Sequence, residues 1–219
     1  MKSLIDQKVP QIDASDRVIW KWSGNNCYPI QNIMERWYAS SAPALPKVIT
    51  NSIWSACVPP RAQLVIWMAN LEKLKTGDFL VERGIIEAQQ AVCPFCRMEI
   101  ETNSHILFSC RFSWSIWMEI LAWWGITGVL QNRCGDFLLA WSGLVTRRKW
   151  IKLWHLVLGC VIWSLWYERN QVKFEDHEPN LQKLVFLLKV RIRVWAKELL
   201  GFRECSAIEF VHNIHGVLK

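Results

Sequence analysis

The chain has 219 residues, with 26 Lys and Arg against 19 Asp and Glu and a formal net charge of +7. A hydrophobic fraction of 52% and a charged fraction of 21% exclude a disordered or collagen-like chain. The length corresponds to one domain or two small ones, and it is sufficient to bury a core without disulfides.

Residues 1–45 are predicted to be a lead-in segment. They do not read as a secretory signal, because they have no apolar core and carry Asp6, Asp13 and Asp16 early. We therefore expect an intracellular protein, in the nucleus or cytoplasm and not secreted, whose cysteines are thiols or metal ligands. Apolar and polar residues partly alternate on both sides of the turn residues 23–26, and this pattern is compatible with a short N-terminal β-hairpin.

The rest of the chain is predicted to be mainly α-helical, with a small cysteine-rich insert. Apolar residues recur at helical spacing and turn residues separate the segments. Gly84, Gly125 and Gly201 follow three of these segments, as expected of helix ends. The predicted helices cover residues 30–39, a segment beginning at Pro46, and residues 61–74, 78–83, 109–124, 147–169 and 181–200.

Two apolar stretches could be mistaken for membrane spans. Residues 112–130 are interrupted by Glu119, and residues 153–167 fall short of the ~20 apolar residues that a span needs. We expect no membrane span. The charge is uneven, because 13 basic and 7 acidic residues lie after residue 145, which is a net +6.

The most specific spacing in the chain is C-x2-C-x8-H-x4-C, formed by Cys93, Cys96, His105 and Cys110. Two cysteines three residues apart can present both thiolates to a metal, and a following His and Cys can complete a tetrahedron. Three thiolates and an imidazole favour Zn²⁺, and four protein ligands leave no open position. The pattern predicts one structural zinc ion. A redox pair at Cys93 and Cys96, or four unlinked residues, are the alternatives.

Other candidate residues receive simpler interpretations. Glu99 and Glu101, between the predicted ligands, are expected to form a solvated face. Cys160 lies in an apolar run and is expected to be a core thiol. The chain contains 15 Trp. Seven of them are expected to form surfaces that other domains would cover, and to be exposed in this chain: Trp117, Trp123, Trp124, Trp150, Trp154, Trp163 and Trp166.

An ordered set of short motifs resembles a known family. The motifs are Ile53-Trp54, Val58-Pro59-Pro60-Arg61, Thr76-Gly77-Asp78, Cys93-Pro94-Phe95-Cys96, Glu101-Thr102, His105-Ile106-Leu107-Phe108-Ser109-Cys110, Trp163-Ser164-Leu165-Trp166 and Arg169-Asn170. They are similar to the zinc-binding domain of plant non-LTR (LINE-type) retrotransposon reverse transcriptases. The resemblance covers roughly residues 16–175. It implies a zinc-binding domain over 46–128, followed by a helical connector over 129–219.

The resemblance also implies a nucleic-acid context, although no enzyme activity is expected. The chain has no Asp-Asp pair of the kind that a polymerase uses to hold two metal ions. Only 45 residues follow Phe174, too few for an RNase H domain with its carboxylates.

The last long helix is the candidate for contact with RNA or DNA. Lys183, Lys189, Arg193 and Lys197 are predicted to lie opposite its apolar face, where basic side chains could contact phosphates. The alternatives are a solvated face, a membrane surface or an acidic partner. We therefore expect a non-catalytic zinc-stabilised module that assists nucleic-acid binding. The alternative is a structural connector between polymerase and RNase H domains, with no activity of its own.

Overall fold

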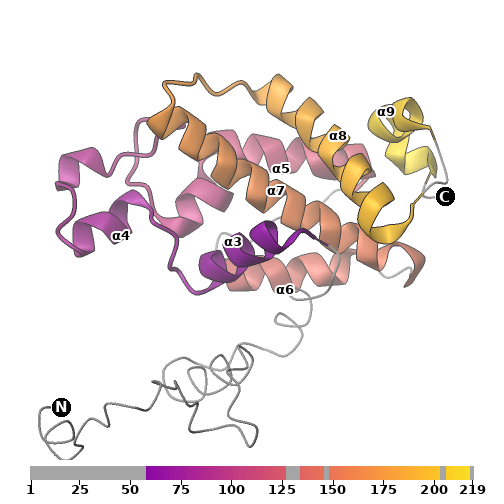
Figure 1. The fold of residues 1–219 in the computed structure, drawn as a ribbon, viewed down its shortest axis with the longest axis horizontal. Helices are drawn as coiled ribbons and strands as arrows, with labels where there is room; N and C mark the ends of the chain where they lie inside the picture. The colour runs from indigo at the N-terminus through magenta and orange to yellow at the C-terminus, as the bar shows by residue number, and fades with distance from the viewer. Residues whose placement is uncertain (1–57, 127–133, 146–147, 203–205, 218–219) are drawn as a thin grey trace, which may run out of the picture. The chain divides into compact units, whose positions relative to one another are not determined.

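The computed structural model describes residues 58–126, 134–145, 148–202 and 206–217. The predicted hairpin and the helices before residue 58 lie outside these residues. Within them the chain forms helices and no β-strand, with one isolated antiparallel bridge between Val92 and Ile100. The prediction of a mainly α-helical fold is therefore confirmed (Figure 1).

The structure describes nine helical elements in chain order. They are α3 (Pro60–Asn70), α4 (Gly77–Glu82), the 3₁₀ turn η2 (Ala88–Gln90), the π-helical turn η3 (His105–Ser109), α5 (Arg111–Trp124), α6 (Cys134–Leu144), α7 (Arg148–Phe174), α8 (Leu181–Leu200) and α9 (Ala207–Val217).

Local signals explain several helix ends. Gly125 and Gly201 end α5 and α8 in the left-handed conformation, with φ of 75° and 66°. An L-residue with a side chain rarely adopts this conformation. The Oδ1 atom of Asn180 accepts a hydrogen bond of 2.9 Å from the backbone N–H of Lys183 and so caps the start of α8. The sequence therefore predicted α8 residue for residue.

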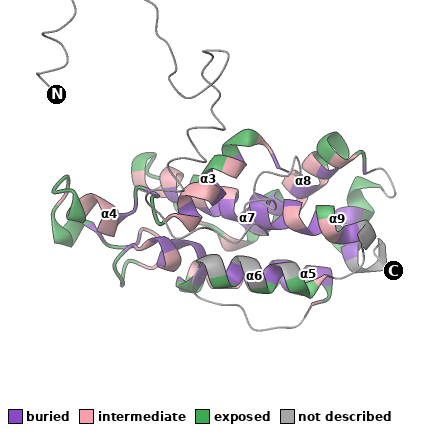
Figure 2. Cartoon of the chain, turned by 90° about the horizontal axis from the view of Figure 1, so that it is seen from below, coloured by how far each residue is buried: buried purple, intermediate pink, exposed green. Residues whose placement is uncertain are grey.

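Helix α7 lies at the centre of the helical body (Figure 1) and packs against α3, α8 and η3. At Gly159 the approach is especially close, because an added Cβ would lie 2.5 Å from Cγ1 of Val58, just before α3, and 3.2 Å from Cδ1 of Ile66 in α3. Most of α7 is buried, whereas the region around α4 is largely exposed (Figure 2). By length and apolar composition alone α7 could cross a membrane over Trp150–Phe174, but 67% of its apolar window is buried inside the fold. A core helix has the same properties.

Tryptophans form the centre of the core. Trp117, Trp141 and Trp154 are completely buried. The rings of Trp141 and Trp154 stack with their centroids 3.9 Å apart. Each indole N–H donates to the other residue's backbone carbonyl, at 3.2 Å and 2.7 Å. Both buried N–H groups of this stack thus have an acceptor, as buried indoles require.

The prediction that seven tryptophans would be exposed is wrong. Trp117, Trp123, Trp124, Trp150 and Trp154 are buried, and Trp163 and Trp166 are half-buried. The cover comes from α6 and α9, two helices that the sequence did not predict. Phe137 of α6 lies 4.7 Å from the Trp117 ring, and Phe210 of α9 lies 5.5 Å from the Trp123 ring. Residues on both sides of the predicted boundary at 128/129 share this core.

Candidate metal centre

The first two predicted ligands lie on a tight turn. The backbone N–H of Cys93 donates to the carbonyl of Glu99 at 2.8 Å, and that of Arg97 donates to the carbonyl of Cys93 at 2.9 Å. Arg97 has a φ of 55°, so the chain reverses direction directly after Cys96. This turn holds the Cys93 and Cys96 thiols near one point. We call residues 91–110, which contain the turn and all four ligands, the zinc module.

The other two predicted ligands lie at the ends of the π-helical turn. The backbone N–H of Cys110 donates to the carbonyl of His105 at 2.8 Å, a bond five residues long. Such wide turns often occur at functional sites. Cys110 is also the N-terminal capping residue of α5, so the fourth ligand is placed by a long, well-packed helix.

The four ligand atoms lie close enough together to hold one zinc ion. They all lie within 4.8 Å of one another. The Sγ atoms of Cys93 and Cys110 are 3.8 Å apart, and Sγ of Cys96 is 3.4 Å from Nε2 of His105. Zn–S bonds of about 2.3 Å and Zn–N bonds of about 2.0–2.1 Å place two sulfurs about 3.8 Å apart and a sulfur and a nitrogen about 3.5 Å apart. The residues thus fit one structural zinc ion.

Glu99 determines which nitrogen of His105 would bind the metal. Its Oε2 atom lies 3.3 Å from Nδ1 of His105 and can accept the proton of that nitrogen, which leaves the lone pair of Nε2 for the metal. The histidine is buried, whereas 72% of the Glu99 side chain is exposed. Glu99 is therefore solvated, as predicted, and in addition orients a ligand.

The ligands interact strongly with one another before any metal binds. The thiol of Cys93 donates to Cys110, and together with burial this raises the pKa of Cys93 to about 12. The same hydrogen bond is the main cause that lowers the pKa of Cys110, and backbone N–H groups of Phe112 and Ser113 add to it. The hydrogen bond with Cys93 raises the pKa of His105 to about 9. A metal that binds here must displace the protons of Cys93 and His105.

The prediction that Glu101 forms part of a solvated face is wrong, because its side chain is completely buried. Arg169 of α7 donates to it twice, from Nε to Oε1 at 2.5 Å and from Nη2 to Oε2 at 2.9 Å. Lys173 and the backbone N–H of Gly77 donate to Oε2 at 3.2 Å and 3.0 Å. Four donors compensate for the cost of burying a carboxylate.

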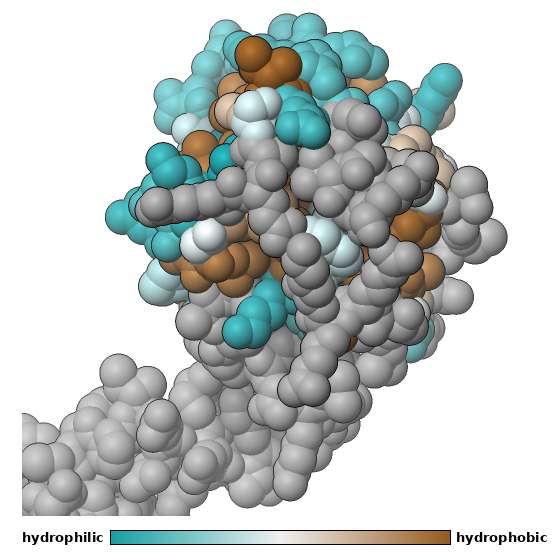
Figure 3. All heavy atoms as spheres, turned by 90° about the vertical axis from the view of Figure 1, so that its right-hand side faces the viewer, coloured by the Kyte–Doolittle hydropathy of each residue, from teal (hydrophilic) through white to brown (hydrophobic). Residues whose placement is uncertain are grey.

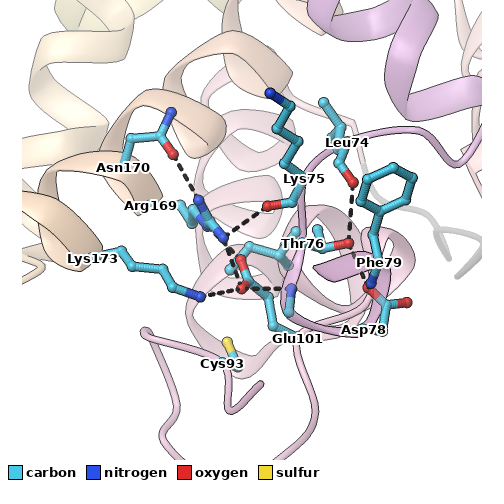
Figure 4. A network of polar contacts seen from close by, with 12 residues as sticks. Leu74, Lys75, Thr76, Asp78, Phe79, Cys93, Glu101, Arg169, Asn170 and Lys173 are labelled. Carbon is cyan, nitrogen blue, oxygen red and sulfur yellow. Dashed lines mark hydrogen bonds and ion pairs between the residues drawn. The ribbon is translucent and has the colours of Figure 1, made fainter. Parts of the chain in front are cut away.

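Figure 4 shows that this network joins three segments that are distant in sequence: the zinc module, the start of α4 and the last turns of α7. Arg169 also donates to the carbonyl of Lys75 at 3.1 Å. Gly77 lies so close to the zinc module that an added Cβ would be 2.7 Å from the backbone of Ala91. Sequence reasoning missed this network. Glu101 and Arg169 both fall within the motifs that carry the family resemblance, and their presence there was the one sign in the sequence that these two residues matter.

Two of the four side chains predicted to contact nucleic acid interact instead with other residues of the fold. The ammonium group of Lys189 lies 5.4 Å from the centre of the Trp123 ring, and burial lowers its pKa. Arg193 donates to the carbonyl of Phe202 at 3.1 Å and lies over Phe210. Both are half-buried, whereas Lys183 and Lys197 are exposed. The four residues do not form one solvated basic face.

The remaining candidates have ordinary structural roles. Cys160 is a completely buried thiol in α7, and burial raises its pKa to about 12. This confirms its interpretation as a core residue. His155 is half-buried on the same helix, and burial lowers its pKa. Within the described residues no other group of three or more potential ligands lies close enough to hold a metal ion.

Comparison with known proteins agrees with this geometry. Residues 22–117 match the family model described as zinc-binding in reverse transcriptase, and all four ligands lie inside the match. Over residues 22–117 the chain is similar to reverse-transcriptase zinc-binding domains. This confirms the family that the motifs predicted and a zinc ion as its cofactor. The match ends within α5, so Arg169, the partner of Glu101, lies beyond it.

A protein of Arabidopsis thaliana, named as a candidate ribonuclease H protein, is 21% identical over 189 residues. The alignment covers 85% of this chain and 29% of the relative, so the chain spans less than a third of that protein's length. No solved structure matches the chain.

Proposed function

We propose that the chain is a non-catalytic, zinc-stabilised accessory module that connects parts of a larger retroelement protein, such as its polymerase and RNase H domains. The observation that carries this proposal is the buried contact between Glu101 of the zinc module and Arg169 of α7. This contact makes the module and the helical body one unit. A unit of this kind can hold neighbouring domains at a fixed distance.

Two further observations support a connecting role. The predicted ligands form a closed set of four, which leaves no coordination position for a substrate. The relative is a much longer protein, of which this chain covers 29%. We expect the module to act inside the cell, in the nucleus or cytoplasm, beside those neighbouring domains.

The proposal is tested by reconstitution. The zinc-loaded chain is mixed with separately expressed polymerase and RNase H segments of a retroelement protein of this family, and the mixture is analysed by size exclusion with light scattering. We expect co-elution with at least one segment. Removal of a ligand by Cys93→Ser should abolish co-elution, whereas Cys160→Ala, in a buried thiol outside the centre, should preserve it. Separate elution of all segments would overturn the proposal.

Nucleic-acid binding is the second candidate, and it rests on the exposed Lys183 and Lys197 and on the net +6 after residue 145. Contacts with phosphates release counterions, so affinity for single-stranded RNA would fall as salt rises. The double variant Lys183→Glu and Lys197→Glu should then bind more weakly than the wild type. Absence of RNA binding at low salt would exclude this candidate.

A further inference from the structure

Helix α8 carries two apolar stripes, and its own fold covers only one of them. The inner stripe packs against α5, α7 and α9, and its buried members are Leu184, Val185, Leu188, Ile192 and Ala196. A surface helix of a single domain needs only this stripe. A second stripe on the outward side therefore needs its own explanation.

The second stripe has the spacing of a coiled-coil seam. Leu187, Val190 and Val194 follow one another at intervals of three and four residues, and Lys183 and Lys197 continue the same spacing at each end. We call these five residues the outer seam. At about 1.5 Å per residue it is roughly 21 Å long, which is two heptads.

The outer seam is open to solvent. Leu187 and Val194 are 41% and 50% exposed, and Val190 is half-buried. Phe186, directly beside the seam, is 55% exposed. Leu187 and Val194, one heptad apart on the same side of the helix, are thus both exposed apolar side chains next to the exposed Phe186, and such a patch can mark a surface that binds a partner. The end of the molecule that carries the last turns of α8 and α9 also shows hydrophobic side chains among hydrophilic ones (Figure 3).

The charges around the seam define the partner. Lys183 and Lys197 are exposed at its two ends. Arg191 and Arg193 flank the seam on the helical projection, but each also donates within the fold, to Oγ of Ser164 and to the carbonyl of Phe202, so Lys183 and Lys197 are the exposed basic groups here. Glu198 is the only acidic residue of α8. Charges beside a coiled-coil seam select partners of opposite sign.

We propose that the outer seam of α8 docks an amphipathic helix of another protein or domain, whose apolar stripe is flanked by Glu or Asp residues. This inference rests on the proposed connecting role and adds the surface and the chemistry of the partner. The apolar stripe favours a helix over a nucleic acid as the partner. A phosphate placed beside Leu187 and Val194 would lose hydration and gain neither a hydrogen bond nor an ion pair from them.

The test uses two labelled synthetic helices of about 28 residues, long enough to be helical. Both have Leu at the seam positions, but one has Glu and the other Lys at the flanking positions. Fluorescence anisotropy measures their binding to the full zinc-loaded chain. We expect the Glu peptide to bind at least about tenfold more tightly than the Lys peptide, a difference of about 1.4 kcal/mol. Equal binding of both peptides, or no binding, would overturn the inference.

Two variants test the surface. Leu187→Glu with Val194→Glu should abolish binding of the Glu peptide while zinc content and helical circular dichroism stay unchanged. The matched control is Leu64→Glu with Ile85→Glu, which adds the same charge at exposed apolar residues outside α8 and outside the zinc module. This control should bind normally. Loss of binding in the control alone would place the site elsewhere and overturn the inference.

Other occupants give distinguishable results. If a second copy of the chain covers the seam, light scattering would show a dimer that the Leu187→Glu and Val194→Glu variant dissociates, and the inference would be wrong. If this variant still co-elutes with the polymerase or RNase H segment, the connecting role stands and the outer seam is not its site. If it loses RNA affinity and the Glu peptide does not bind, the seam contacts nucleic acid.

Discussion

Glu101 of the zinc module and Arg169 of α7 form a buried bidentate ion pair across 68 residues of sequence. The carboxylate is completely buried and the guanidinium almost so, and the guanidinium also lies 4.8 Å from the centre of the Trp166 ring. Such a pair adds little stability compared with apolar residues, but it is costly to break on one side. Its effect is to hold the zinc module against α7.

Replacement of Glu101 by Gln should destabilise the protein strongly. The variant leaves Arg169 buried without a charged partner, and the free energy of unfolding should fall by about 3 kcal/mol. Urea unfolding of the zinc-loaded protein measures this loss. The control is Glu178→Gln, which removes the exposed partner of Arg97 and should cost less than about 1 kcal/mol. Equal losses in both variants would contradict the importance assigned to the buried pair.

Removal of the metal should unfold the zinc module. The purified chain should contain about one zinc ion, because four ligands close a single tetrahedron. A chelator should then lower helical circular dichroism and the melting temperature, and zinc should restore both. Mass spectrometry of bound metal checks the stoichiometry. Cys93→Ser should lose the metal, whereas Cys160→Ala should retain it. A folded chain that binds no zinc would contradict this interpretation.

Zinc affinity should fall as the pH falls. Before zinc binds, the pKa of Cys93 is raised to about 12 and that of His105 to about 9, so both are protonated at neutral pH. Zinc binds the deprotonated forms, so each zinc ion should release about two or more protons near neutral pH. Lower pH therefore favours the metal-free protein. Calorimetric titration in two buffers with different heats of ionisation measures this release, and a release of zero protons would refute the prediction.

Glu99 should affect zinc affinity although it does not bind the ion. Glu99→Gln weakens the acceptor that orients His105 through Nδ1, and zinc affinity should fall by about 10- to 100-fold. Competition with a colorimetric chelator measures the affinity. Glu82→Gln, an exposed carboxylate of α4, serves as the control and should bind zinc normally. An unchanged affinity for Glu99→Gln would show that His105 is oriented by packing alone.

Two glycines should respond to alanine in opposite directions. In Gly159→Ala the new Cβ would lie 2.5 Å from Cγ1 of Val58 and 3.2 Å from Cδ1 of Ile66, so the packing there must shift and the free energy of unfolding should fall by about 1–3 kcal/mol. Gly143, in α6, has nothing within 4 Å of an added Cβ. Alanine there should stabilise the helix by about 0.5–1 kcal/mol. Thermal unfolding compares the two, and a change of the same sign in both would contradict the close packing at Gly159.

The sequence predicted best where a local signal was sufficient. Asn180 and Gly201 mark both ends of α8, and the spacing of Cys93, Cys96, His105 and Cys110 identified the metal ligands. Helices α6 and α9 were not predicted from the sequence. Helix α6 is apolar on nearly every side, so it shows little amphipathic pattern, and α9 is only 11 residues long. Without these two helices the tryptophans of α5 and α7 appeared to lack cover.

The sequence by itself determined the metal chemistry and the helical class, because both follow from residue type at short spacing. Only the tertiary structure decided which polar residues are buried and which apolar residues are not. Glu101 is buried because Arg169 approaches it from a helix that is distant in sequence. The ammonium group of Lys189 lies over the Trp123 ring because α5 packs against α8. The outer seam stays exposed because α5, α7 and α9 all cover the opposite side of α8. Such contacts depend on how helices pack, which local sequence patterns do not specify.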